Sequence, residues 1–254
     1  MSAAARNLGV IGGSGLCCLD ALVVEEAIEM TTPYGPPSAP LLRGHLGGQA
    51  LVFLPRHGAD HSIAPHRINY RANLWALREA GVREVVAVST VGGIAPQMTV
   101  GGLVLPDQII DYTWGRESSF FDGVCAPLQH VDFTRPFCAV LGERLSRAAA
   151  RAGVSLRPGG VYGATQGPRL ETAAEIRRMA HDGAELVGMT GMPEAVLARE
   201  LGLHYAMLAA VVNPAAGCGD NPGGLSMALI RAVSAQLMRD VLQVLAMMGA
   251  DDGG

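Results

Sequence analysis

The sequence predicts an α/β protein in which a mixed central β-sheet is flanked by helices. Short apolar stretches alternate with stretches of helical spacing along most of the chain, which is typical of strands covered by helices. At 254 residues the chain is long enough to bury one sizeable core, and no linker, repeat or low-complexity tract divides it. The 33 glycines and the 49% hydrophobic content indicate tight packing of helices on a sheet. We therefore expect residues 1–254 to form a single domain.

The individual elements follow from the spacing of apolar residues and from the glycines and prolines that end each stretch. Apolar or alternating stretches predict a strand that starts at residue 161 and further strands at residues 7–11, 21–30, 41–46, 49–54, 84–89, 103–112, 186–189 and 203–212. Apolar residues three and four apart predict helices that start at residues 171 and 193 and further helices at residues 68–81, 135–153 and 225–248. The three strands between residues 21 and 54 are expected to form an antiparallel meander. Trp75, in the first helix, is expected in the core rather than at a ligand.

Charge and composition exclude several classes of function. A net charge of −4 and a pI near 6.0 provide no broad cationic surface, so we expect no binding to nucleic acid or to an anionic membrane. No apolar run reaches the length of a membrane span and residues 1–6 do not resemble a signal peptide, so a cytoplasmic location is expected. All 19 basic residues are arginine, which excludes lysine chemistry. Any phosphate site must therefore use arginine, histidine, hydroxyl groups or backbone N–H groups.

Neither the cysteines nor the histidines predict a metal site. The cysteines are odd in number, lack the spacing of metal ligands and are expected to be reduced and mostly buried; they are Cys17, Cys18, Cys125, Cys138 and Cys218. Three histidines fall within ten residues, at His57, His61 and His66. The neighbouring residues Pro55, Gly58 and Pro65 prevent the helix that a zinc-binding pair four residues apart needs. We expect no metal and no cofactor.

Hydroxyl groups and glycines occur together at the ends of three predicted strands, at Ser14, Thr90 and Thr190. A glycine turn exposes backbone N–H groups and a hydroxyl to an anion. Because ligands of open α/β sheets bind at the carboxyl ends of the strands, we expect these three ends to form one phosphate site. For the first motif alone a plain turn is the simpler interpretation. A dinucleotide-binding motif is excluded there, since Cys18 stands where its last glycine would fall.

Other polar residues also follow predicted strands. Arg56 and His57 come directly after the strand at 49–54, and arginine beside histidine suits an oxyanion. A surface ion pair is the better explanation of these two residues in isolation. Arg169 and Glu171 follow the strand that starts at residue 161, so we expect chemistry at this point of the chain as well.

A series of motifs between about residues 8 and 213 resembles the trimeric purine nucleoside phosphorylase and methylthioadenosine phosphorylase family. The motifs appear in the order of the family: Gly12-Gly13-Ser14-Gly15-Leu16, Pro55-Arg56-His57-Gly58, His61-x-x-x-Pro65, Asn69-Tyr70-x-Ala72-Asn73, Thr90-x-Gly92-Gly93, Gly167-Pro168-Arg169, Glu171-Thr172-x-x-Glu175, Gly183-Ala184-x-x-Val187-Gly188-Met189-Thr190 and Pro193-Glu194-x-x-x-Ala198. One short motif is weak support, but this many in sequence are specific. The resemblance implies a phosphate-dependent pentosyltransferase with inorganic phosphate as co-substrate.

The resemblance also assigns roles to residues. It implies a phosphate cradle made of Ser14, Arg56, His57, Thr90, Thr190 and the backbone N–H of Val91. Met189 is expected beneath the ribose and Leu170 beside the substrate, although Met189 by itself reads as an ordinary core residue. The long loop after residue 112 carries His130, which is expected to cover the 5′ end of the ribose from the neighbouring subunit of a homotrimer. An ordinary interface histidine explains His130 equally well.

The base pocket departs from the adenosine-type branch of the family. That branch carries aspartates where this chain has Asn213 and Ala215. A 6-oxopurine presents an acceptor at carbon six, so Asn213 can donate to O6 while its carbonyl accepts N7–H, and Glu171 can accept N1–H. Asn213, Arg56 and His57 are therefore the expected catalytic residues. The alternatives are that Asn213 only braces the turn before Pro214 and that Glu171 is only an acid at a helix start.

The expected reaction combines this pocket with the motif set, which is more similar to the methylthioadenosine branch. That branch accommodates an apolar 5′-methylthio group, so we expect phosphorolysis of 5′-methylthioinosine to hypoxanthine and 5-methylthioribose 1-phosphate. Residues 217–225 depart from both branches and leave the lining of the 5′ pocket open. The alternatives are a general inosine/guanosine phosphorylase, a methylthioadenosine phosphorylase and, outside this class, a purine-binding module without turnover.

Overall fold

The computed structural model describes residues 7–13, 16, 21–124, 126–219 and 227–251. Its strands are β1 (Leu8–Gly12), β2 (Leu22–Ile28), β3 (Leu41–Leu46), β4 (Gln49–Pro55), β5 (Glu84–Gly93), β6 (Leu103–Leu105), β7 (Gln108–Asp111), β8 (Leu156–Pro158), β9 (Val161–Ala164), β10 (Leu186–Gly188) and β11 (His204–Pro214). Its helices are α1 (Tyr70–Glu79), α2 (Ala139–Ala152), α3 (Ala173–His181), α4 (Gly191–Glu200) and α5 (Met227–Ala246), with short turns of 3-10 helix at Pro65–Arg67 and Met247–Asp251. Ser14, Cys17, Cys18 and Cys125 lie outside the described residues, so what was expected of them stays a prediction.

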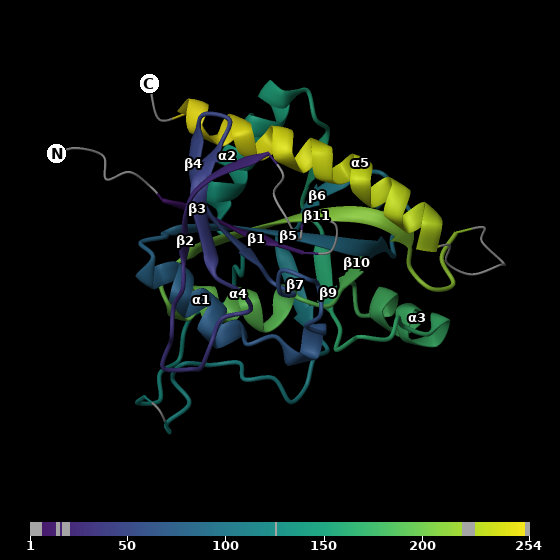
Figure 1. Ribbon diagram of the computed structural model, residues 1–254. Coiled ribbons are helices and arrows are strands. Elements are labelled where there is room, and N and C mark those ends of the chain that lie inside the picture. Colours follow the sequence, from purple (N-terminus) through teal and green to yellow (C-terminus); the bar gives the residue numbers. More distant parts are fainter. Residues whose placement is uncertain (1–6, 14–15, 17–20, 125, 220–226, 252–254) are drawn as a thin grey trace.

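The described strands form one mixed sheet, whose strands are drawn as arrows in Figure 1. Its order is β2-β3-β4-β1-β5-β10-β9-β7, while β11 pairs with β5 and β6, and β8 pairs with β6. The centre is parallel, because β1 runs parallel to β4 and β5, and β5 runs parallel to β11. Strands β2, β3 and β4 are antiparallel neighbours. The predicted α/β fold with a mixed central sheet is confirmed, and so is the meander.

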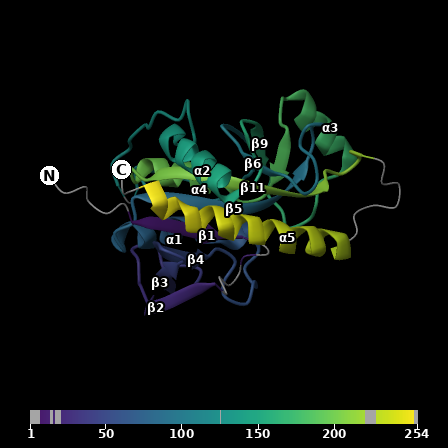
Figure 2. The same cartoon turned by 90° about the horizontal axis from the view of Figure 1, so that it is seen from above.

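Side chains alternate along the central strands, and the two sets pack against different helices. On β5, Val85 and Ala87 join the core that contains residues of α1 and α4, whereas Val86 and Val88 join the core that contains residues of α2 and α5. Figures 1 and 2 show α5 running across one face of the sheet and α1 with α4 on the other. Because both faces are covered, the central strands read as continuous apolar runs. Trp75 packs against the first of these cores, as predicted.

One predicted strand is wrong, and one was not predicted. The stretch at 103–112 is two strands, β6 and β7, that lie in different parts of the sheet. Pro106 between them has no N–H for a strand ladder, and the chain turns there so that β6 pairs with β11 and β8 while β7 pairs with β9. The short strand β8 gave no clear apolar pattern in the sequence. The expectation of mostly buried cysteines is also wrong for Cys138 and Cys218, which are free and partly exposed.

Local signals explain where the helix next to the predicted site begins. We expected a helix from residue 171, but α3 begins at Ala173 because Thr172 is its N-cap. The Thr172 hydroxyl accepts from the backbone N–H of Glu175, and the Glu175 carboxylate accepts from the backbone N–H of Thr172 in a capping box. This fixes the segment that carries Glu171 immediately before the helix.

In the described part of the chain, no helix has the length and apolar composition needed to cross a membrane.

Candidate active site

A cleft with a volume of about 510 Å³ is lined by residues of β5, β10 and β11 and of the segment that follows β4. It collects side chains from segments up to 174 positions apart, between Arg56 and Ile230. The predicted site residues that line it are Arg56, His57, Thr90, Val91, Leu170, Glu171, Met189, Thr190 and Asn213. His130 does not line this cleft, since its side chain is exposed on the long loop between β7 and α2. The structure therefore brings together the predicted site residues of one chain that it describes, while the prediction for His130 concerns a neighbouring subunit and stays a prediction.

The sheet topology corrects how these residues meet. Thr90 does not end a strand, because β5 continues through Gly93. Strand β10 runs antiparallel to β5, so the chain after β10 returns along β5 rather than ending beside its carboxyl end. This places Thr190 next to Ser89, with 3.3 Å between their hydroxyl oxygens, and both side chains are buried. The expected convergence of strand carboxyl ends is therefore wrong in its geometry for Thr90 and Thr190, although both line the cleft, and it stays a prediction for Ser14.

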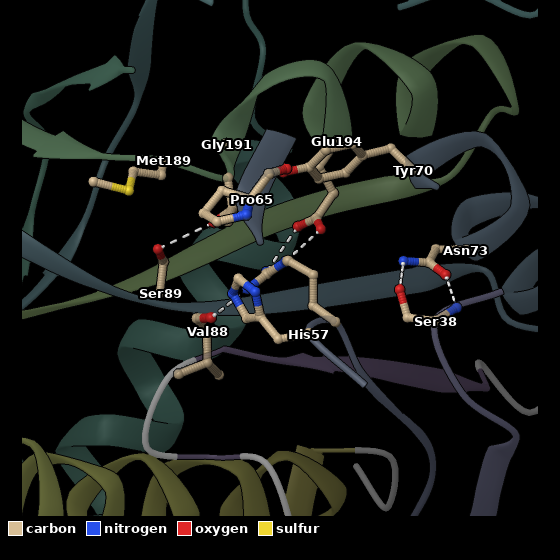
Figure 3. A network of polar contacts seen from close by, with 12 residues as sticks. Ser38, His57, Pro65, Tyr70, Asn73, Val88, Ser89, Met189, Gly191 and Glu194 are labelled. Carbon is tan, nitrogen blue, oxygen red and sulfur yellow. Dashed lines mark hydrogen bonds and ion pairs between the residues drawn. The ribbon is translucent and has the colours of Figure 1, made fainter. Parts of the chain in front are cut away.

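Arg56 is held by a carboxylate that the sequence analysis did not assign to the site. Its Nε donates to Glu194 Oε2 at 2.7 Å, its Nη2 donates to Glu194 Oε1 at 2.9 Å, and its Nη1 donates to the Val88 carbonyl at 3.2 Å. Both Arg56 and Glu194 are 0% exposed, and Figure 3 shows the Glu194 carboxylate with the dashed lines of these two bonds. An arginine has five N–H groups. These bonds use one on each nitrogen, which leaves one on each terminal nitrogen for a ligand.

Glu194 fixes the charge states of this buried cluster. Burial by itself lowers the pKa of a guanidinium, but the charge and hydrogen bonds of Glu194 raise the pKa of Arg56 above its ordinary value. Tyr205 donates its hydroxyl to Glu194 Oε1 at 2.8 Å. Burial, and next the charge of Glu194, raise the pKa of Tyr205 well above its ordinary value, so the hydroxyl keeps its proton. The result is a buried ion pair beside the cleft, in which Glu194 keeps the guanidinium of Arg56 protonated and fixes its orientation.

His57 is neutral in this setting. Burial and the charge of Arg56 lower its pKa from 6.5 to about 4. Its Nδ1 lies 2.8 Å from the carbonyl oxygen of Ile63. Because a carbonyl only accepts, Nδ1 carries the proton of the neutral ring and Nε2 is left as an acceptor.

Glu171, which also lines the cleft, is oriented by a hydroxyl group. Thr165 Oγ1 donates to Glu171 Oε1 at 2.6 Å and lies 3.3 Å from the carbonyl oxygen of Gly188. Thr165 is the first residue after β9, and its backbone N–H donates to the same Gly188 carbonyl at 2.8 Å. The Glu171 carboxylate therefore lines the cleft with Oε1 bound to Thr165, and its Oε2 is left to accept from a ligand.

Asn213 lies inside β11 and not after it, at a point where the strand is irregular. The pairing of β11 with β5 shifts by one residue between Val211 and Asn213. The amide nitrogen of Asn213 donates to the carbonyl of Pro214 at 2.6 Å, which is the bracing bond expected of the simpler alternative. An amide has a second N–H and a carbonyl oxygen, so this bond leaves one donor and one acceptor for a ligand. A Cβ at Gly92 would lie 3.3 Å from that amide nitrogen, so glycine keeps the wall flat here.

Met189 is held against a glycine that no other residue can replace without strain. Gly167 has a φ of +59°, and a Cβ there would lie 2.5 Å from the Met189 sulfur. The chain turn after β9 thus packs directly on the side chain that lines the cleft.

Arg169, in contrast, is exposed and forms an ion pair with Glu175 at 2.7 Å. It lines a second cleft of about 480 Å³ that shares Glu171 with the first, so the expectation of chemistry at Arg169 is not supported.

Three residues near the cleft were missed by sequence reasoning: Ser89, Thr165 and Glu194. Ser89 precedes a motif that was recognised, and Glu194 is part of one. A Pro-Glu pair at a helix start normally places the acid in solvent, near the positive end of the helix. Nothing in the local pattern indicates that Glu194 is fully buried.

The family model described as "Phosphorylase superfamily" matches residues 7–246. The chain is 53% identical over 220 residues to a "Probable S-methyl-5'-thioinosine phosphorylase" of Xanthomonas campestris, which covers 87% of this chain and 88% of that protein. A protein of the same description from Xylella fastidiosa is 54% identical over 213 residues, covering 84% of this chain and 90% of that protein.

More distant relatives differ in description. A "6-oxopurine nucleoside phosphorylase" of Pyrococcus furiosus is 46% identical over 216 residues, covering 83% of this chain and 80% of that protein. Among solved structures, a methylthioadenosine phosphorylase from Schistosoma mansoni in complex with adenine superposes with a TM-score of 0.88 at 30% identity. The superposition covers 97% of this chain and 93% of that one.

Proposed function

The chain belongs to the phosphorylase superfamily, and from this premise we propose that it cleaves 5′-methylthioinosine with inorganic phosphate. The products are hypoxanthine and 5-methylthioribose 1-phosphate. The observation that carries the choice of base is the pair of Glu171 and Asn213 on the walls of one cleft. Its relatives from Xanthomonas and Xylella, described as S-methyl-5′-thioinosine phosphorylases, support the choice of sugar.

Phosphate binds between Arg56, His57 and the hydroxyl groups of Thr90 and Thr190, all of which line the cleft. The two free N–H groups of Arg56 donate to phosphate oxygens, and its charge is permanent because Glu194 holds it. The Nε2 of neutral His57 accepts a hydrogen bond from the P–O–H group of hydrogenphosphate. Ser14 and the backbone N–H of Val91 complete the proposed cradle; the position of Ser14 lies outside the described residues.

The purine binds at the opposite end. Glu171 accepts N1–H, a donor that a 6-oxopurine has and adenine lacks. Asn213 donates to O6 with its second N–H and accepts N7–H with its carbonyl oxygen. A site built in this way rejects a 6-aminopurine, because the mismatch leaves buried polar atoms unpaired. Leu170 and Met189 supply apolar contact to the base and ribose.

In the reaction, a phosphate oxygen forms a bond to C1′ while the C1′–N9 bond breaks. The electron pair of that bond passes to the purine ring, and a proton from solvent is taken up at N7. Holding phosphate against C1′ supplies the proximity effect. Hydrogen bonds from Asn213 to the departing base stabilise its developing negative charge. Arg56, His57 and Asn213 are therefore the proposed catalytic residues.

The 5′ end of the substrate lies against an apolar part of the cleft. Ile63, Ala64 and Pro65 line it from the segment after β4, and Ile230 lines it from α5. Such a surface suits a methylthio group better than a hydroxyl, which would lose its hydrogen bonds to water. We further propose that the chain acts as one domain in a cytoplasmic homotrimer, with no cofactor, and that His130 of a neighbouring subunit closes this end.

A panel of four nucleosides tests the proposal: methylthioinosine, methylthioadenosine, inosine and guanosine, each with and without phosphate. We expect base release that requires phosphate and the highest kcat/KM on methylthioinosine. A higher kcat/KM on inosine or guanosine supports the general 6-oxopurine activity, for which the Pyrococcus relative is the precedent. A preference for methylthioadenosine contradicts the assignment of a 6-oxopurine base. Nucleoside binding without release of the base in any of these mixtures contradicts the proposed enzymatic activity.

A further inference from the structure

Arg116, on the long loop after β7, makes an unusual number of hydrogen bonds to backbone carbonyls. Its Nη1 donates to the carbonyl of Met189 at 2.9 Å and to the carbonyl of Met192. Its Nη2 donates to the carbonyls of Thr165 at 3.1 Å and Gln166 at 2.9 Å. Its Nε donates to the side-chain oxygen of Gln166 at 3.2 Å. One partly buried guanidinium therefore joins the turn after β9 to the turn after β10.

These two turns carry different parts of the candidate site. Glu171, which faces the proposed base, follows the turn after β9, and Met189 and Thr190, which face the proposed ribose and phosphate, form the turn after β10. The two strands pair only over short stretches, from Leu186 to Gly188 on β10. The Thr165 N–H donates to the Gly188 carbonyl at the end of the paired stretch, and Gly167 packs on Met189 just beyond it. The bonds from Arg116 continue this link to Gln166 and Met192 and so help to set the spacing between the two turns.

The same guanidinium reaches a third wall of the cleft. Its Nη1 lies 3.2 Å from the hydroxyl oxygen of Tyr70, and its central carbon lies 5.5 Å from the centre of the Tyr70 ring. The Tyr70 hydroxyl in turn donates to the carbonyl of Pro65 at 3.0 Å. Pro65 lines the cleft on the side proposed for the 5′ end of the substrate.

We propose that Arg116 is a positioning residue that fixes the base-binding, ribose-binding and 5′ walls of the cleft relative to one another. It does not line the cleft and so acts through the backbone it binds. This inference rests on the proposed phosphorolysis, because its consequence for rate is the alignment of phosphate with C1′. A lysine cannot replace it, since an ammonium has three donors around one atom and cannot span two separated turns.

The test compares Arg116→Lys with Arg71→Lys in the full chain. Arg71, on α1, binds the same loop through Glu117 at 2.8 Å and the Ser119 carbonyl at 3.4 Å, and these contacts reach neither turn. For Arg116→Lys we expect kcat on the preferred nucleoside to fall about 100-fold, as for a misplacement of about 1 Å. KM for phosphate and nucleoside should stay within about threefold, because each half of the site still binds its own ligand. Arg71→Lys should keep kcat within about threefold.

Hydrogen exchange provides a readout that does not depend on activity. In Arg116→Lys we expect faster amide exchange in both peptides 163–170 and 186–192, and in Arg71→Lys in neither. Arg116→Ala serves as a second variant, whose kcat should recover partly with added guanidinium and not with equal methylammonium. Unchanged exchange in both peptides, or unchanged kcat with normal folding, overturns the proposal. Absence of phosphorolysis by the parent protein contradicts the proposed function, while the exchange data still decide the role of Arg116.

Discussion

Replacing Glu194 by glutamine is expected to destabilise the protein strongly, although Glu194 touches no proposed substrate. The carboxylate is 0% exposed and accepts three hydrogen bonds, two from Arg56 at 2.7 and 2.9 Å and one from Tyr205 at 2.8 Å. Glutamine keeps the shape but removes the charge, so one amide hydrogen must face a guanidinium or a hydroxyl donor. Arg56 then remains as a buried charge without a counterion.

The magnitude follows from the burial of both partners. Breaking a buried ion pair by removing one member costs about 3–5 kcal/mol, because the remaining charge is left uncompensated. For a chain of 254 residues the entropy of unfolding is about 0.5 kcal/mol per degree. We therefore expect Glu194→Gln to lower Tm by about 6–9 °C.

Differential scanning calorimetry of Glu194→Gln and of the double variant Arg56→Met/Glu194→Leu measures this effect. Replacing both members by apolar residues removes the uncompensated charge, so the double variant should regain most of the lost Tm. It should not regain activity, because Arg56 is part of the proposed phosphate site. Phosphate should raise the Tm of Glu194→Gln more than that of the parent, since the anion replaces the missing charge. A Tm loss below about 2 °C in Glu194→Gln refutes the reasoning about buried charge.

Two further predictions concern Thr165 and His57. Thr165→Val removes the hydroxyl that donates to Glu171 at 2.6 Å, so kcat/KM on a 6-oxopurine nucleoside should fall about 10-fold. The activity should recover in Thr165→Ser and stay unchanged in the exposed control Thr134→Val. Equal kcat/KM values for Thr165→Val and the parent protein contradict the role of this hydrogen bond. The pKa of His57 is lowered from 6.5 to about 4, so between these pH values the unfolded chain binds a proton that the folded protein does not. The free energy of unfolding should therefore fall as pH falls from about 6.5 to about 4. Urea titrations of His57→Gln should show a weaker dependence of this free energy on pH. The same pH dependence in the variant and the parent protein excludes His57 as its source.

The sequence predicted most of the fold from local patterns, and the resemblance to the family selected the residues of the cleft. Apolar strands bounded by glycine and proline located the central sheet, and the motifs shared with the family singled out Arg56, His57, Glu171 and Asn213 among the polar residues that follow predicted strands. The antiparallel direction of β10 was not predictable, since strand order depends on pairing between distant segments. This is why the geometry around Thr190 differs from the expectation although its membership in the cleft does not.

Residues that act by long-range contact could not be found from the sequence. Glu194 lies 138 positions from Arg56 and begins a helix, where an acid is ordinary. Arg116 lies in a loop without any motif, and its importance follows only from carbonyls about 50 and 75 positions further along the chain. Arginine in a polar loop usually indicates a solvated surface, so the pattern gave no reason to select this one.

Whether Asn213 reads the group at carbon six of the purine decides the substrate assignment. The most direct measurement is the ratio of kcat/KM on methylthioinosine to kcat/KM on methylthioadenosine, in the parent protein and in Asn213→Asp. Aspartate has the same size but replaces the donor to O6 with an acceptor that suits a 6-amino group. We predict a ratio well above one in the parent and a decrease of at least about 10-fold in the variant. A ratio that is the same in both proteins contradicts the account and leaves Asn213 with only its bond to the Pro214 carbonyl.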